Sequence, residues 1–167
     1  VKQIINYEKR EFYSMTCFGD ITDYWVLDFS TPGQYDVIYN HIMTHKYYMS
    51  CQEKTEISME DAILSWFNNV YLPLASIINK KHMLRRFPRR TIGDLYVWTV
   101  RYWDDLKQKF GDDIPMDKAV SDFNKKYRIP FLRRILNRIK CIILRKSIET
   151  SHPFPTEQKL DGKKFQC

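Results

Sequence analysis

Apolar residues recur every three or four positions along most of the chain, the spacing that places them on one face of an α-helix. Val1 to Met15 puts Ile4, Ile5, Phe12 and Met15 on such a face. Ile21 to Phe29 is aromatic and β-branched, but it is short and has no evident partner strand, which favours a connecting segment. The pattern predicts an all-α fold, a compact orthogonal bundle of five to seven helices. The expected helices cover 1–15, 30–52, 58–83, 91–110, 115–127 and 130–148.

Capping residues and prolines mark the expected ends of these helices. A Ser or Thr side chain at the N-cap accepts a backbone N–H of the first turn, and a proline in that turn leaves no N–H unpaired. Pro73 lies inside an expected helix that continues to Met83, and it predicts a kink or a restart. Gly111 predicts a stop. The expected starts are Ser30-Thr31-Pro32, Ser58 with Asp61, Thr91 with Asp94, Pro115 and Pro130.

The composition indicates one folded domain. The chain has 167 residues, of which 44% are hydrophobic and 15% aromatic, and this excludes a disordered chain. Only 5 residues are glycine, which makes a glycine-rich phosphate-binding loop improbable. We expect a single helical domain over residues 1–149, followed by a flexible tail over 150–167 with two prolines and three lysines.

Positive charge is concentrated in two parts of the chain, although the net charge of +7 describes the whole. Lys80 to Arg90, called the basic segment below, holds six cations and no acid. Residues 125–146 hold nine cations and no acid, and without these nine the net charge would be −2. The candidate phosphate-contacting residues are Lys80, Lys81, Arg85, Arg86, Arg89, Arg90, Arg133, Arg134, Arg138, Lys140 and Arg145.

The last expected helix has one apolar half and one basic half when it is drawn at roughly 100° per residue. Three interpretations fit this pattern. The helix can be a core helix with a basic solvated face, it can contact a nucleic-acid backbone, or it can bind a membrane surface or a partner helix. An exposed apolar face, with Ile135, Ile139 and Ile143, would favour the third interpretation.

The stretch from Lys80 to Trp98 is similar in layout to a helix–turn–helix, a weak signal that any pair of helices shares. Its second helix is rich in apolar residues and is therefore expected in the core, not in a DNA groove. Tyr47-Tyr48 and Tyr96 could stack on bases, but aromatic residues at helical spacing are more often core residues.

Candidate catalytic residues are few. His41 and His45 lie four positions apart on an expected helix, but no third metal ligand is evident nearby. His45 is then expected to pack or hydrogen-bond inside, with His41 nearer solvent. We expect no enzyme activity, no bound metal and no cofactor. The 4 cysteines form no C-x-x-C pair, and neither a signal peptide nor a membrane span is visible, so a cytoplasmic protein is expected.

Three strings resemble the C-terminal region of bacterial ParB-like transcriptional regulators, of the ParB/sulfiredoxin type. The longest, from Phe87 to Trp98, is similar to that family's F-P-G-R-T-x-x-D-L-Y-x-W, with Arg89 in place of the glycine. The others run from Pro32 to Met49 and from Trp66 to Pro73, in the same order as in the family. The similarity covers roughly Tyr7 to Gly111 and leaves out the second basic stretch.

The resemblance implies a role in DNA-related regulation. In that family a ParB-type domain with a D-G-x-H-R-V-like motif precedes this region, and no such motif occurs here. We therefore expect the chain to be the helical C-terminal part of a longer protein, or a product without its N-terminal half. The expected function is a non-enzymatic module that contacts DNA phosphates through its basic segments. The alternative is a protein–protein or membrane-surface interaction module.

Overall fold

The computed structural model describes residues 1–22 and 27–127, all of them within one compact unit, Val1–Arg128. No strand occurs in these described ranges, and α4, η1 and α5 follow one another without a break, which leaves seven helical segments. The predicted all-α fold of five to seven helices is confirmed. The elements are α1 (Lys2–Thr16), α2 (Phe18–Ile21), α3 (Gln34–Glu53), α4 (Met59–Trp66), the π-helical turn η1 (Phe67–Tyr71), α5 (Leu72–Lys80), α6 (Met83–Arg86), α7 (Ile92–Phe110) and α8 (Met116–Tyr127).

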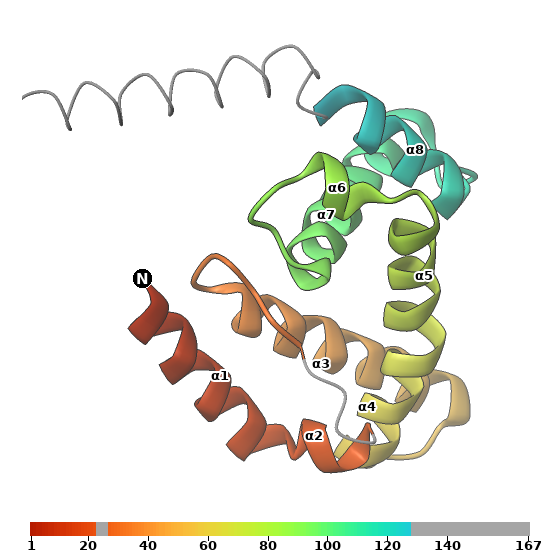
Figure 1. Cartoon of the computed structure of the whole chain (residues 1–167). Coiled ribbons are helices and arrows are strands. Elements are labelled where there is room, and N and C mark those ends of the chain that lie inside the picture. Colours follow the sequence, from red (N-terminus) through yellow and green to blue (C-terminus); the bar gives the residue numbers. More distant parts are fainter. Residues whose placement is uncertain (23–26, 128–167) are drawn as a thin grey trace, which may run out of the picture. The chain divides into compact units, whose positions relative to one another are not determined.

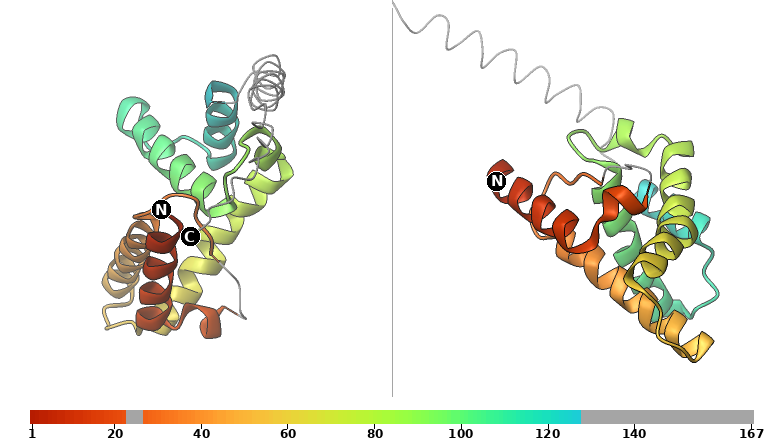
Figure 2. Two further views of the ribbon diagram at one scale, coloured as in Figure 1. Left: turned by 60° about the vertical axis from the view of Figure 1, so that its left-hand side comes forward. Right: turned by 90° about the horizontal axis from the view of Figure 1, so that it is seen from below.

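The helix α5 joins two groups of helices (Figure 1). On one side α1 packs against α3 and α4, and on the other side α7 contacts α5 and α8. A further contact between α3 and α7 links the groups directly, and Figure 2 shows the same helices from two other directions. The expected helix 130–148, the domain boundary after residue 149 and the tail lie outside the described residues.

Aromatic rings form the centre of the unit. Trp66 lies in edge contact with Phe18 and Tyr96, with ring centroids 6.5 and 5.9 Å apart. Tyr71 packs on both Trp66 and Tyr96 at 5.5 and 5.0 Å. Such tilted and edge contacts add to the free energy gained from burying large apolar surfaces. The rings come from α2, α4, η1 and α7, so one cluster holds together helices distant in sequence.

Three of the predicted helix ends are confirmed. The Ser58 side chain accepts the backbone N–H of Asp61 at the start of α4. At the start of α7, Thr91 and Asp94 form a reciprocal capping box. Gly111, with φ 93°, ends α7. Each of these features depends on groups within a few residues of one another, which is why the local pattern predicted them.

The predicted start of α3 was wrong. The helix does not begin at Ser30-Thr31-Pro32; its N-cap is Gly33, with φ 79°, and its first residue is Gln34. The Gly33 N–H donates to both carboxylate oxygens of Glu8 on α1, at 3.0 and 2.8 Å. A carboxylate from another helix thus takes the place of the expected hydroxyl cap, and a negative charge at a helix N-terminus is electrostatically favourable.

The region around α1 and α2 differs from expectation in two respects. Ile5 and Phe12 of α1 are buried as expected, whereas Ile4 and Met15 are exposed, which was not expected. The expected break over 16–20 contains the short helix α2. Cys17, with φ 50°, ends α1, and the chain then turns Phe18 into the core.

The restart expected at Pro73 takes the form of a π-helical turn. The Leu72 N–H donates to the Phe67 carbonyl, five residues back, and α5 then runs with Pro73 in its first turn. Proline has no N–H and its ring collides with the carbonyl four residues earlier, so a wider turn before it relieves both problems. The helix expected to reach Met83 ends at Lys80, because His82 adopts a left-handed backbone with φ 49°.

No helix among the described residues combines the length and the apolar character that a membrane crossing requires.

Candidate nucleic-acid interface

The basic segment runs from the last residue of α5 through α6 to the start of α7. Its backbone is fixed by two apolar side chains, Met83 and Phe87, which are buried. The Phe87 ring stacks on Phe123 of α8 with centroids 5.7 Å apart. Anchoring these two side chains in the core turns other positions of the segment to solvent, because residues between them on a short helix face away from the anchor.

Three of the six candidate cations of the basic segment are exposed. Lys80 ends α5, Arg85 lies on α6, and Arg89 lies in the connection to α7. The segment itself contains no acid. These three side chains carry positive charge at the solvent-exposed surface.

The other three cations, Lys81, Arg86 and Arg90, are half-buried. Lys81 forms an ion pair with Asp117 of α8, with Nζ 2.8 Å from a carboxylate oxygen. Arg90 donates to the Ser30 hydroxyl at 2.9 Å, and its guanidinium lies over the Trp98 ring, 4.8 Å from the centroid. Lys81 and Arg90 therefore hold the basic segment against the protein. Sequence reasoning missed their partners, because nothing in the local pattern links residues so far apart.

Arg89 has a left-handed backbone, with φ 66°. This conformation favours glycine, since a Cβ atom is crowded there. Glycine at this position removes a cation and readily adopts the left-handed backbone conformation. Arg89→Gly is therefore a well-suited variant for testing the charge of the segment.

The remaining candidate residues are not covered by the structure. Arg133, Arg134, Arg138, Lys140 and Arg145 lie outside the described residues. The same holds for Ile135, Ile139 and Ile143, whose exposure would separate the interpretations of that stretch.

The helix α7, whose start is the second helix of the layout that resembles a helix–turn–helix, is a core helix in its first turns, as expected. Leu95, Tyr96 and Val97 of α7 are buried and cannot reach a DNA groove. Tyr47 and Tyr48 are 65% and 61% exposed, so the core interpretation is confirmed for Tyr96 and wrong for this pair.

The structure places the two histidines of α3 apart in their contacts. In the described ranges no three His, Cys, Asp or Glu side chains are arranged to hold a metal ion. His45 hydrogen-bonds to the Ser65 hydroxyl, with Nε2 2.9 Å from Oγ, as the interior interpretation expected. His41 was expected nearer solvent, which was wrong: it is the more enclosed of the two because it faces Tyr96 of α7.

The free energy of unfolding is expected to fall as the pH is lowered from about 7.5 to about 5.5. Burial lowers the pKa of His41; Asp104 opposes this and Arg101 adds to it. Burial also lowers the pKa of His45. The unfolded chain, with the ordinary histidine pKa of about 6.5, takes up protons first, so stability is complete above that value and is lost as the pH falls towards the folded-state pKa.

Urea unfolding at the two pH values measures this effect. His41→Gln should flatten the dependence, whereas His82→Gln, at an exposed position, serves as the control. A dependence as steep in His41→Gln as in the wild type would contradict the assignment to His41.

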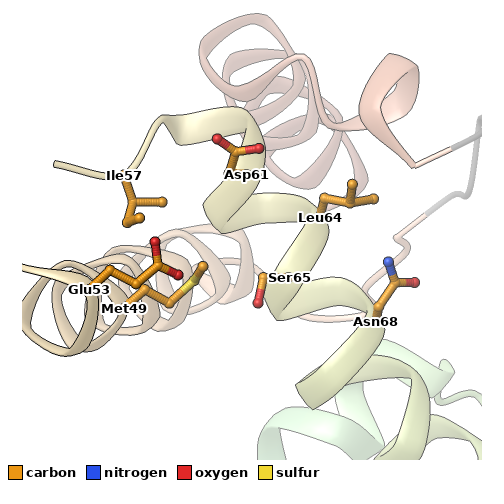
Figure 3. A pocket seen from close by; sticks show the side chains of 7 residues that line it. All are labelled: Met49, Glu53, Ile57, Asp61, Leu64, Ser65 and Asn68. Atoms are coloured by element: carbon orange, nitrogen blue, oxygen red, sulfur yellow. The ribbon is translucent and has the colours of Figure 1, made fainter. Parts of the chain in front are cut away.

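A hollow of about 350 Å³ lies between the end of α3 and α4 (Figure 3). Asp61 accepts the Ser58 hydroxyl at 2.7 Å, and Ser65 is engaged by His45 and Asn69. Asp61 and Ser65 therefore already have hydrogen-bond partners within the protein. The hollow is lined by Met49, Glu53, Ile57, Asp61, Leu64, Ser65 and Asn68.

Comparison with family models, with curated proteins and with solved structures found no match to this chain.

Proposed function

We propose that this chain is a non-enzymatic helical module that contacts the phosphate backbone of DNA through its basic segment. The observation that carries the proposal is the exposure of Lys80, Arg85 and Arg89 on a stretch without acids, fixed to the core by Met83 and Phe87. Clustered cations gain free energy on binding a nucleic acid, because condensed counterions leave the phosphates.

The burial of the start of α7 bears on how the chain would contact DNA. Its first turns are buried, so these residues of α7 cannot read base edges in the major groove. Phosphate contacts position a protein on the duplex and carry no sequence information. The proposed binding is therefore sensitive to salt and nearly independent of sequence. DNA-related regulation as a ParB-like module is also what the sequence resemblance implies, and we include it in the proposal.

Fluorescence anisotropy with two labelled duplexes of unrelated sequence tests the proposal. We expect both duplexes to bind with similar affinity and with an affinity that falls steeply as salt is raised. The triple variant Lys80→Ala, Arg85→Ala, Arg89→Gly should lower the slope of log affinity against log salt by roughly three, because each phosphate that keeps its counterions reduces the slope by about one. Both duplexes should weaken equally.

The matched control is Lys2→Ala, Arg10→Ala, Lys54→Gly. It removes three exposed cations elsewhere, and Lys54 shares the left-handed backbone of Arg89, with φ 56°. The proposal fails for the basic segment if this control weakens binding as much as the first variant. It fails altogether if the wild type binds neither duplex at low salt, or binds anionic vesicles and no DNA.

The contribution of the second basic stretch, residues 125–146, to DNA binding is measured separately. A variant with Arg133, Arg134, Arg138, Lys140 and Arg145 all changed to alanine should reduce the salt slope further if those cations also touch phosphates. If it alone abolishes binding while the triple variant has no effect, the basic segment is not the interface.

A further inference from the structure

A series of aromatic rings connects the basic segment to the exposed end of α8. Phe87 of the basic segment stacks on Phe123, and Phe123 packs on Tyr127 in the next turn of α8, with centroids 4.9 Å apart. Tyr102 of α7 meets both rings edge-on, 5.7 Å from Phe123 and 5.8 Å from Tyr127. The series begins in the core at Phe87 and ends at the surface, where Tyr127 is 47% exposed.

Lysine side chains accompany this exposed ring. The Nζ of Lys126 lies 5.1 Å from the centroid of the Tyr127 ring and 5.2 Å from that of Tyr102. The pKa of Lys126 is raised by a hydrogen bond with Tyr127 and, to a lesser extent, by the charge of Asp105. Lys125, the preceding residue of α8, is exposed as well. The end of α8 therefore presents an aromatic ring together with two cations.

An exposed aromatic ring beside clustered cations is the arrangement with which proteins hold single-stranded nucleic acids. The cations follow the phosphates, and the ring stacks on a base, whatever the base is. In a duplex the faces of the bases are covered by the neighbouring base pairs, and exposing one requires unstacking. Only an unpaired base can therefore stack on Tyr127 without that cost.

We propose that this chain binds an unpaired strand of DNA, with a base stacked on Tyr127 and the nearby phosphates held by Lys125, Lys126 and the basic segment. The inference rests on the proposed function and narrows it to a class of DNA. A duplex is then held through its phosphates alone, whereas an unpaired strand gains the stacked base in addition.

Fluorescence anisotropy with two labelled single strands of equal length tests the stack on the full chain. One strand is oligothymidylate, and the other is the same sugar–phosphate chain with abasic residues in place of the thymidines. Both strands offer the same number of phosphates, so a difference in affinity reports on the bases. The wild type should bind oligothymidylate about tenfold more tightly than the abasic strand, the difference expected for one base stacked on an aromatic ring.

Two variants of Tyr127 separate the ring from the rest of the side chain. Tyr127→Leu keeps an apolar side chain against Phe123 and removes the ring, so it should bind both strands equally and bind a duplex as the wild type does. Tyr127→Phe keeps the ring and should retain the tenfold preference. The matched control, Tyr47→Leu, removes a ring that is 65% exposed on α3 and should also retain the preference.

Three results would overturn this inference while leaving salt-dependent duplex binding, and with it the proposed function, in place. The first is equal affinity of the wild type for oligothymidylate and the abasic strand. The second is an undiminished preference in Tyr127→Leu. The third is a Tyr127→Leu variant that loses as much affinity for the duplex as for oligothymidylate. A wild type that binds no DNA of any kind at low salt would overturn both the inference and the proposed function.

Discussion

Replacing Asp94 by alanine is expected to lower the free energy of unfolding by about 4 kcal/mol. Asp94 is 0% exposed, and its carboxylate accepts the Ser30 N–H at 3.0 and 3.2 Å and the Thr91 N–H at 2.9 Å. Hydrogen bonds to an ionised group contribute about 1.5–3 kcal/mol each, and removing the acceptor leaves both donors without their partner. Urea unfolding followed by circular dichroism measures the change.

The control for Asp94→Ala is Asp61→Ala. Asp61 occupies the same third position of α4 after its own capping residue, but it lies at the exposed surface, where it accepts the Ser58 hydroxyl. Its loss should cost about 1 kcal/mol or less. Equal losses in the two variants would mean that the link from α7 to Ser30 contributes nothing beyond local capping.

Replacing Gly93 by alanine is expected to lower the free energy of unfolding by about 3 kcal/mol. A Cβ atom at this position would lie 2.6 Å from the Asp28 carbonyl oxygen and 2.6 Å from a ring carbon of Phe29. The backbone oxygen and the buried ring cannot move away easily. Alanine normally stabilises a helix by about 1 kcal/mol relative to glycine, so a loss of stability would mean that the collision outweighs this preference.

Gly19→Ala is the matched control, in the short helix α2. There the closest atoms to a Cβ are 3.5 and 3.6 Å away on the Tyr13 ring, an ordinary contact distance. The free energy of unfolding should stay the same or rise by up to about 1 kcal/mol. Differential scanning calorimetry of both variants gives the comparison, and a Gly93→Ala protein as stable as Gly19→Ala would refute the close packing.

Both predictions concern the junction where the segment 27–33 meets the start of α7. The Thr91 hydroxyl donates to the Asp28 carbonyl at 2.6 Å, and Arg90 reaches the Ser30 hydroxyl in the same region. This junction fixes the end of the basic segment. Destabilising it should therefore also weaken any DNA contact that needs Arg89 in its present position.

The candidate site was only partly predictable. The clustering of cations in Lys80–Arg90 is a property of the sequence, and so is the apolar character of the helix that follows. The contacts of Lys81 and Arg90 could not be predicted, because they depend on Asp117, Ser30 and Trp98. A cavity of about 260 Å³ between α3 and α7 was not predicted either, since its lining residues come from six different elements.

By itself, the sequence determined the all-α fold, the caps at Ser58 and Thr91 and the stop at Gly111. These features arise from hydrogen bonds and side-chain spacing within about one helical turn, so the order of residues is enough to specify them. Only the tertiary structure decided that Glu8 caps α3 and that Asp94 holds Ser30. These two contacts join residues 25 and 64 positions apart, and no local pattern encodes which distant groups the packing of the helices will bring together.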